Sequence, residues 1–362
     1  MKQIKSKCSA LLFLLILLIS GCVSKSNQSS ITYIQKENDD GGIGDFQDAV
    51  RTGDISKVKS LLKKGVDIDG ALAGGRTALM IAVALGNSEM VDILIKKGAL
   101  VNLKQDDGAT AVMISAGLGD DLLTGTLISS GADVNLATNG GVTALMFASM
   151  SDSFETVDRI LKAGARVDVA DETGQTALMV ACSENRAEIV KLLLDKGAKT
   201  DLKRKDGKTA LNAAVYSNNE IIGNMLLERG AKPVADNEGE TPLMIACRQG
   251  SLSFVKLFYD YDNSSINEIK RGGWSPLMIA AGEGEYEIVE FLVDKGALVN
   301  SSNVTGWTPI MFAACKGYKN IVELLLKKGA DTSLKDALGK NASELARDSG
   351  FLEISKIIAG WK

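Results

Sequence analysis

The sequence predicts an all-α protein in which pairs of short helices repeat along the chain as a solenoid. Three observations carry this prediction. A segment that opens with Thr, Ser or Asn returns every 32 to 34 residues, and a glycine stands two positions before each opening. Two short apolar runs follow each opening, separated by residues typical of turns. Because each unit of such an array buries its apolar face on its neighbours, a chain of 362 residues need not divide into separate cores.

The first residues indicate an export signal. Three lysines precede an almost unbroken apolar run at residues 8–19. This run is shorter than the ~20 residues that cross a bilayer, and it fits the apolar core of a signal peptide. The tetrapeptide that ends at Cys22, Ile-Ser-Gly-Cys, resembles the bacterial lipobox. The resemblance implies that residues 1–21 are removed as a lipoprotein signal peptide and that Cys22 is lipidated. The alternative is an ordinary signal peptide that contains a cysteine.

Residues 22–44 form the predicted tether. They are rich in Ser, Asn, Asp and Gly and show little apolar periodicity, which is typical of a flexible linker. A multiply acylated Cys22 at its start would anchor the protein stably to a membrane. The next residue, Val23, is not the acidic residue that signals inner-membrane retention in such lipoproteins. The resemblance therefore favours the outer membrane of a bacterial cell envelope, with the folded part facing the periplasm or the surface.

Each repeat opens with a residue that caps a helix. The side-chain oxygen of Thr, Ser or Asn accepts a hydrogen bond from a backbone N–H that the first turn leaves unpaired. Three repeats place proline directly afterwards, where a helix needs no donor. The openings stand at Thr77, Thr110, Thr143, Thr176, Thr209, Thr241, Ser275, Thr308 and Asn341.

Glycine marks the turns of the repeat. The glycines two positions before the openings predict a turn with positive φ. A second apolar run closes most repeats at Gly-Ala, as at Gly98 and Gly329. Nine residues after each opening stands a residue type that tolerates the left-handed conformation ending a helix. These residues are Gly86, Gly119, Asp152, Asn185, Asn218, Gly250, Gly284, Gly317 and Gly350. The order predicted for each unit is a glycine turn, a first helix, a tight turn, a second helix and a loop.

The completed pattern resembles the ankyrin repeat. The unit that reads GWTPIMFAA from Gly306 and IVELLLKKGA from Ile321 carries this resemblance most clearly. It covers residues 45–362: an N-terminal cap at 45–74, about eight full repeats and a C-terminal repeat at 339–362. Ankyrin repeats usually carry His fourth in the opening tetrapeptide, whereas seven repeats here carry Met. Methionine there predicts core packing and not a metal or redox site, so stability rests more on packing than on a polar tie.

The composition excludes the common catalytic and nucleic-acid-binding classes. The chain has no histidine, so it holds no Ser–His or Cys–His pair and no His metal ligand. With a net charge of −4, the chain lacks the excess of basic residues that is typical of nucleic-acid-binding proteins. Cys182, Cys247 and Cys315 fall in separate repeats, and at roughly 8–10 Å per helix layer no two reach disulfide distance. We expect free cysteines, no cofactor, no metal and no enzyme activity.

The predicted function is protein binding. Ankyrin arrays bind partners through their loop tips and first helices, so the resemblance implies a monomeric scaffold for an unidentified protein partner. On a lipoprotein of the cell envelope, two roles follow. One is to sequester or neutralise a protein in the periplasm, and the other is to contact a ligand at the surface. The alternative is an enzyme whose site follows no recognised motif.

Two tryptophans are the leading candidate binding residues. Trp274 and Trp307 stand just before the helix openings of adjacent repeats, a place that faces the binding side in the resembled family. Trp, Tyr and Arg dominate interface energetics. The alternative is that both rings cover only the neighbouring loop. Further variable positions nearby are Arg271, Arg248, Tyr216 and Val304.

Two further segments stand out. The basic loop at residues 203–208 is either a solvated tip or a contact for an acidic partner. The repeat that opens at Thr241 lacks the closing Gly-Ala, and the repeat before it is one residue short and contains Pro233. Because repeats are stabilised by their nearest neighbours, residues 233–272 are expected to be the least protected part of the array.

Overall fold

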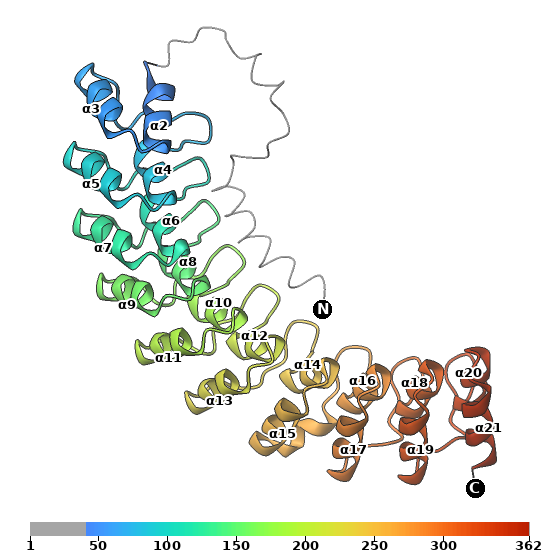
Figure 1. Ribbon diagram of the computed structural model, residues 1–362. Helices are drawn as coiled ribbons and strands as arrows, with labels where there is room; N and C mark the ends of the chain where they lie inside the picture. Colours follow the sequence, from blue (N-terminus) through green and yellow to red (C-terminus); the bar gives the residue numbers. More distant parts are fainter. Residues whose placement is uncertain (1–40, 362) are drawn as a thin grey trace, which may run out of the picture. The chain divides into compact units, whose positions relative to one another are not determined.

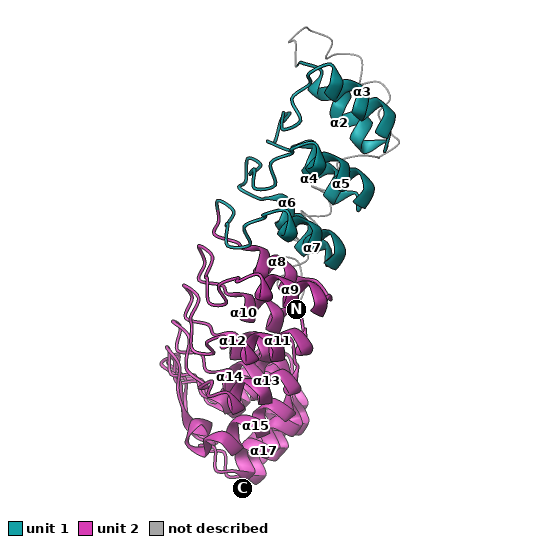
Figure 2. Ribbon diagram, turned by 90° about the vertical axis from the view of Figure 1, so that its left-hand side faces the viewer, with its two compact units in different colours: residues 1–139 teal, residues 140–362 magenta. Residues whose placement is uncertain are grey.

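The computed structural model describes residues 41–361. The chain falls into two compact units, Met1–Asn139 and Gly140–Lys362, which Figure 2 shows in different colours. The predicted signal peptide, the lipidation site at Cys22 and the tether up to residue 40 lie outside the described residues. Within the described range, no helix is both long enough and apolar enough to cross a membrane.

The all-α prediction is confirmed. The helices come in consecutive pairs, and the pairs stack side by side within each unit (Figure 1). Between residues 41 and 361 the only strand-like pairings are isolated bridges, Ala170 with Thr176 and Lys270 with Trp274. The pairs of the first unit are α2 (Ile43–Arg51) and α3 (Ile55–Lys63), α4 (Ala78–Ala84) and α5 (Ser88–Lys96), and α6 (Ala111–Leu118) and α7 (Asp121–Ser129).

The second unit continues the same alternation of a first and a second helix. Its first helices are α8 (Ala144–Met150), α10 (Ala177–Ser183), α12 (Ala210–Tyr216), α14 (Pro242–Gln249), α16 (Pro276–Glu283), α18 (Pro309–Lys316) and α20 (Ala342–Asp348). Its second helices are α9 (Phe154–Lys162), α11 (Ala187–Asp195), α13 (Glu220–Glu228), α15 (Leu252–Tyr261), α17 (Tyr286–Asp294), α19 (Lys319–Lys327) and α21 (Leu352–Gly360).

The first helices begin at the predicted caps. The Ser275 hydroxyl, for example, accepts a hydrogen bond from the Met278 N–H at 3.2 Å, but the buried Thr110 hydroxyl makes no cap bond. The seven methionines of the opening segments are at most 2% exposed, so their role in the core is confirmed. One repeat carries Asn212 in place of Met. Its Oδ1 accepts from both the N–H and the hydroxyl of Thr209, at 2.9 and 3.0 Å, which gives this repeat a polar tie.

The glycines before the openings serve two purposes. All nine have positive φ, between 69° and 87°, as predicted. At Gly174 an added Cβ would also lie 2.8 Å from the Cα of Arg204 in the next repeat, closer than real Cβ atoms approach. Glycine therefore permits the turn and the close approach of the next loop, and only the turn could be read from the repeat spacing.

The predicted left-handed residue at the end of the first helix is present in eight repeats and wrong in one. Asp152 is not among the residues with positive φ. The chain leaves α8 one residue earlier, at Ser151, which is extended and whose hydroxyl donates to the Ala148 carbonyl at 2.7 Å. The Asp152 carboxylate instead forms an ion pair with Arg186 at 2.8 Å. A local side-chain bond therefore ends this helix in place of a left-handed residue.

Backbone hydrogen bonds join successive loop tips within each unit. The N–H of Lys205 donates to the Thr173 carbonyl of the preceding loop at 2.8 Å, and the N–H of Val304 donates to the Gly272 carbonyl at 3.0 Å. The same bond is made by the N–H groups of Asp106, Asn139, Glu172, Asn237, Arg271 and Ala337. The side-chain amides of Asn139 and Asn237 also donate to the preceding tip, each at 2.8 Å, whereas the bonds of Arg271 and Val304 involve main-chain atoms alone.

A second set of bonds joins the loops that follow the second helices. An Asp or Asn side chain accepts the backbone N–H of the residue 31 positions later, at 2.8 to 2.9 Å. The accepting residues are Asp69, Asn102, Asp168, Asn267 and Asn300. These side chains are spaced by multiples of 33 residues and fix the distance between neighbouring loops.

The repeat that opens at Thr241, which lacks the closing Gly-Ala, also departs from the regular structure. Helix α15 is followed by a 3-10 helix, η2 (Asn263–Asn267), in place of a loop that closes at Gly-Ala. Phe254 and Phe258 on α15 are buried, with ring centroids 5.7 Å apart. The Phe254 ring fills the space beside Gly223 of α13, where an added Cβ would meet it at 2.4 Å. Aromatic packing thus joins α15 to α13 in this repeat.

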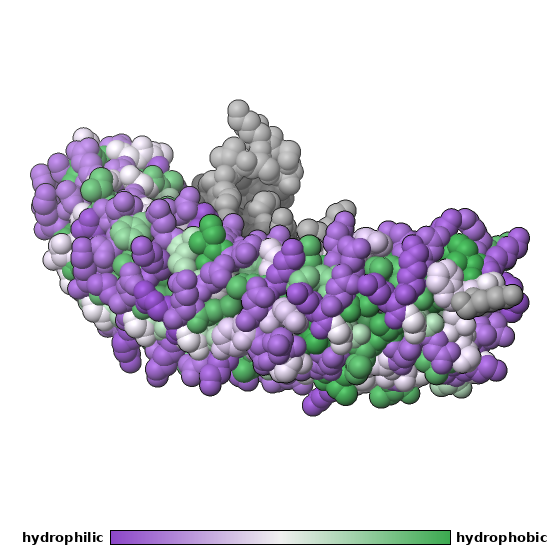
Figure 3. Space-filling model, turned by 90° about the horizontal axis from the view of Figure 1, so that it is seen from below, coloured by the Kyte–Doolittle hydropathy of each residue, from purple (hydrophilic) through white to green (hydrophobic). Residues whose placement is uncertain are grey.

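Hydrophilic residues dominate the face of the molecule in Figure 3, with smaller apolar areas between them. The second helices carry their apolar residues on the side that packs against the first helices, and charged residues on the other. In α9, Val157 and Ile160 are fully buried, whereas Glu155 is exposed. This amphipathic pattern is typical of helices packed on one side only.

Candidate binding surface

In three repeats of the second unit, the side chains at the two positions that flank the first helix meet. The residue before the cap and the residue eight places later lie next to each other, as shown by the ion pair between Lys340 and Asp348 at 2.6 Å. The same positions hold Lys208 with Tyr216 and Glu240 with Arg248. We call the surface formed around these positions in the second unit the aromatic–basic surface. It comprises Lys208, Tyr216, Glu240, Arg248, Lys270, Trp274, Trp307 and Phe312.

An aromatic cluster lies at one end of this surface. The Trp274 and Phe312 ring centroids are 4.6 Å apart, and those of Trp307 and Phe312 are 4.9 Å apart. All three side chains are half-buried. Phe312 packs against the bare backbone of Gly282, where an added Cβ would lie 3.7 Å from the Phe312 Cβ. Both tryptophans therefore contact the same phenylalanine and still expose part of their rings.

A charged cluster adjoins the aromatic one. Glu240 is 8% exposed, and its Oε1 forms ion pairs with Arg248 and with Lys270, the latter at 3.1 Å. The Lys270 ammonium also lies 6.0 Å from the Trp274 ring centroid, a cation–π distance. A buried carboxylate with two cationic partners holds both of them in place. It thereby connects the charged cluster to Trp274.

Tyr216 lies at the other end of the surface. The Lys208 ammonium is 5.4 Å from the Tyr216 ring centroid. Burial raises the pKa of the Tyr216 phenol above its ordinary value, and nearby Glu240 acts in the same direction while Lys208 and Arg248 oppose it. The phenol is thus a neutral hydrogen-bonding group near pH 7, suited to an interface and not to proton transfer.

The six candidate residues fall into two groups. Trp274, Trp307, Arg248 and Tyr216 lie on the aromatic–basic surface. Arg271 and Val304 lie at loop tips, where both are exposed and Val304 is 77% exposed. Sequence reasoning missed Glu240, Lys270 and Phe312, and it included Lys208 only as part of the basic loop at residues 203–208. The available signal was the repeat register, since Lys208 and Glu240 occupy the same position as the two tryptophans.

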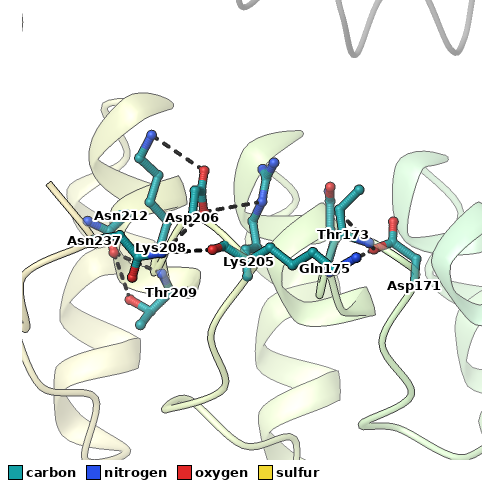
Figure 4. A network of polar contacts seen from close by, with 10 residues as sticks. Asp171, Thr173, Gln175, Lys205, Asp206, Lys208, Thr209, Asn212 and Asn237 are labelled. Atoms are coloured by element: carbon teal, nitrogen blue, oxygen red, sulfur yellow. Dashed lines mark hydrogen bonds and ion pairs between the residues drawn. The ribbon is translucent and has the colours of Figure 1, made fainter.

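Polar contacts organise the loops beside this surface (Figure 4). The Asp171 carboxylate accepts bonds from the N–H groups of Thr173 and Gln175, at 2.7 and 2.9 Å. In the basic loop, Asp206 lies 3.6 Å from the Lys208 ammonium and 3.7 Å from the Arg204 guanidinium. An internal acidic residue therefore neutralises part of the charge of that loop.

The described residues form no metal-binding cluster. No group of three or more Cys, Asp or Glu side chains in residues 41–361 could hold a metal ion. Cys182 and Cys247 are buried, and burial raises the pKa of both thiols far above the ordinary value. Cys315 is half-buried, with its sulfur 3.3 Å from the Ser349 hydroxyl. The prediction of free thiols is confirmed for these three cysteines.

Comparisons with known proteins agree with the helix pairs and glycine turns. The family model for ankyrin repeats (3 copies) matches in overlapping segments: residues 46–138, 116–206, 145–237, 196–270, 222–303, 254–336 and 299–359.

Among curated proteins, the probable 26S proteasome regulatory subunit p28 of Saccharomyces cerevisiae is 38% identical over 65 residues, 18% of this chain and 28% of that protein. The E3 ubiquitin-protein ligase KEG of Arabidopsis thaliana is 33% identical over 64 residues, 18% of this chain and 4% of that protein. BTB/POZ domain-containing protein 3 of Schizosaccharomyces pombe is 37% identical over 65 residues, 18% of this chain and 12% of that protein. The matches thus span less than a third of each relative. Together with the overlapping matches to the family model, which run from residue 46 to 359, they show that this chain belongs to the ankyrin-repeat family.

Proposed function

We propose that this protein is a non-enzymatic scaffold whose aromatic–basic surface binds a protein partner. Ankyrin repeats form scaffolds for protein–protein interaction, and the proposal adds the place of binding. The three curated relatives carry names from different processes, yet each matches over only 64 or 65 residues. The similarity therefore follows the repeat and gives no reason to transfer any relative's activity to this chain.

The cluster of Trp274, Phe312 and Trp307 carries the proposal. Aromatic rings that remain partly exposed offer a large apolar contact area at small entropic cost. Next to them, Arg248 and Lys270 are held by Glu240, so their positions are fixed before a partner arrives. Preorganised aromatic and basic side chains are typical of the residues that contribute most to interface energy.

The proposal extends to a tether in the bacterial cell envelope. The lipobox-like sequence at Cys22 supports an acyl anchor, and the polar residues up to 44 support a linker between anchor and repeats. A tethered scaffold of this kind is suited to sequester or neutralise a partner in the periplasm, with contact to a surface ligand as the second role. The outer membrane is the favoured location.

Site-specific crosslinking tests the binding surface. A photoreactive residue would replace Val304, which is 77% exposed beside the aromatic cluster, in the full chain expressed in its native cells. A matched variant carries the same residue at Ile221, 65% exposed at the start of α13. We expect one discrete crosslinked protein, identified by mass spectrometry, from the Val304 variant alone. Equal products from both positions, or none, would contradict the proposed surface.

Acyl labelling tests the anchor. Cells that express the full chain would be fed radiolabelled palmitate, and the protein would be compared with its Cys22→Ala variant. We expect label and membrane fractionation for the natural sequence and neither for the variant. Equal incorporation in both chains would rule out Cys22 as the lipidation site. The Cys8→Ala variant serves as control, because Cys8 lies within the predicted signal peptide.

A further inference from the structure

One inter-repeat bond of the regular set is missing at Asp201. This residue stands 33 positions after Asp168 and 66 before Asn267, both of which accept a backbone N–H from the next loop. The corresponding donor is the N–H of Lys232, 31 positions later. Within residues 41–361, no hydrogen bond joins Asp201 to Lys232. The two neighbouring loops therefore lack the bond that Asp69, Asn102, Asp168, Asn267 and Asn300 make in their repeats.

The sequence explains the missing bond. Pro233 follows Lys232, and the residue before a proline is restricted to extended conformations. Here the Val234 N–H donates to the Lys232 carbonyl across Pro233 at 2.8 Å, whereas the regular loops turn three to four residues after their closing glycine. This repeat is also one residue shorter than the usual 33, because Thr241 stands 32 positions after Thr209. As a result, the backbone N–H of Lys232 does not form a hydrogen bond with the Asp201 carboxylate.

A cavity lies where the two loops separate. It has a volume of about 630 Å³, and its walls come from the loop after α11 and the loop after α13. Leu194, Ala198 and Val234 give it an apolar lining, and Ala198 is 8% exposed. This volume lies within the roughly 300–1,000 Å³ range of small-molecule sites. It includes no residue of the aromatic–basic surface.

Positive charge dominates the cavity. Its charged lining residues are Lys199, Lys203, Arg229 and Lys232 against the single acidic residue Asp201. Arg229 is paired with Asp195 outside the lining. The three lysines form no ion pair with any residue in the described part of the chain. Lys199, Lys203 and Lys232 are exposed, and three lysines without an ion-pair partner in the lining of one cavity favour an anion there.

We infer that this cavity binds the phosphate group of a small organic anion. Lysine ammonium groups bind phosphate as point charges, and three of them match the charge of a phosphate monoester or diphosphate. The apolar lining suits the carbon part of the same molecule. Such a group comes either from a soluble phosphate ester or from the headgroup of an acidic phospholipid. Binding here is independent of partner binding at the aromatic–basic surface.

Calorimetric titration of the full chain with inorganic pyrophosphate tests the soluble source. The site variant carries Lys199→Ala, Lys203→Ala and Lys232→Ala. The control variant carries Lys64→Ala, Lys97→Ala and Lys327→Ala, which removes the same charge at exposed positions far along the sequence. Thermal melting of all three chains establishes that each is folded. We expect saturable 1:1 binding to the natural chain and the control, and at least tenfold weaker binding to the site variant.

Flotation with vesicles tests the lipid source. Vesicles of phosphatidylglycerol and phosphatidylcholine would be compared with vesicles of phosphatidylcholine alone, using the same three chains. Since residues 1–40 are identical in all three, a difference between variants reports on the cavity. Loss of phosphatidylglycerol-dependent flotation in the site variant alone supports the inference with a lipid headgroup as ligand. If neither probe distinguishes the site variant from the control, the inference is wrong.

Discussion

Glu240 and Arg248 form an ion pair across a single repeat, between the residue before the helix cap and the last turn of the same helix. Lys340 and Asp348 repeat this relationship with the charges reversed, and Lys208 and Tyr216 repeat it as a cation–π contact. In these three repeats the residue before the cap therefore supports the end of its own helix, and two of the three pairs belong to the proposed binding surface. Substitutions there have two effects that must be measured separately.

Replacing Glu240 tests whether its ion pairs with Arg248 and Lys270 stabilise the fold. Glu240→Gln keeps the shape of the side chain but removes the charge that faces Arg248 and Lys270. Because the Lys270 side chain is only 18% exposed, its ammonium then lacks a compensating charge. We expect a loss of about 1–3 kcal/mol in the free energy of unfolding in urea. The control Glu228→Gln, on the exposed side of α13, should change it by less than about 0.5 kcal/mol. Equal effects would contradict the structural role of the pair.

Replacing the tryptophans tests the binding surface. Trp274→Ala and Trp307→Ala should each weaken binding of the crosslinked partner by about 2 kcal/mol or more, since a buried aromatic anchor is lost. Binding would be measured by titration with the purified partner, and stability by thermal melting, which should change little. Tyr259→Ala is the control, because its ring pairs with Phe291 on the second helices, 5.5 Å away. Unchanged affinity with a lowered melting temperature would show that the tryptophans serve only the fold.

Alanine substitutions at Gly174 and Gly197 distinguish the cost of backbone strain from the cost of lost packing between repeats. Gly174 and Gly197 have the same φ of 84°, but only Gly174 lies against the next loop. Gly197→Ala should cost about 1–2 kcal/mol for the left-handed conformation alone. Gly174→Ala should cost about 1–3 kcal/mol more, because the added Cβ meets the backbone of Arg204. Urea unfolding of both variants measures the difference, and equal costs would refute the packing role.

Hydrogen exchange tests local stability in the irregular repeats. Amides in residues 233–272 should exchange at least about tenfold faster than those of the regular repeats in residues 273–330. The reason is that a regular inter-repeat bond is missing at Asp201 and that a 3-10 helix replaces the usual loop after α15. Mass spectrometry of exchanged peptides gives the comparison. Uniform protection over both segments would show that the aromatic packing of Phe254 and Phe258 compensates fully.

The repeat period predicted the helix pairs, the caps, the methionine core and nearly all turns, because each depends on local sequence. It failed at Asp152, where a serine hydroxyl one residue earlier ends the helix. The binding surface was predicted only in part. Phe312 occupies a position that is apolar core in most repeats, whereas here it is half-buried and packs beside Gly282 of the preceding repeat. That relationship crosses two repeats, so neither repeat shows it alone.

The hydrogen bonds between loop tips also bear on how such a protein acquires new partners. Arg271 and Val304 contact the preceding loop through their N–H groups, and any residue except proline supplies the same donor. Mutation at these tips can therefore alter what the protein recognises while leaving its assembly intact. A randomised library at Lys205, Arg271 and Val304 should yield mostly folded proteins of diverse specificity.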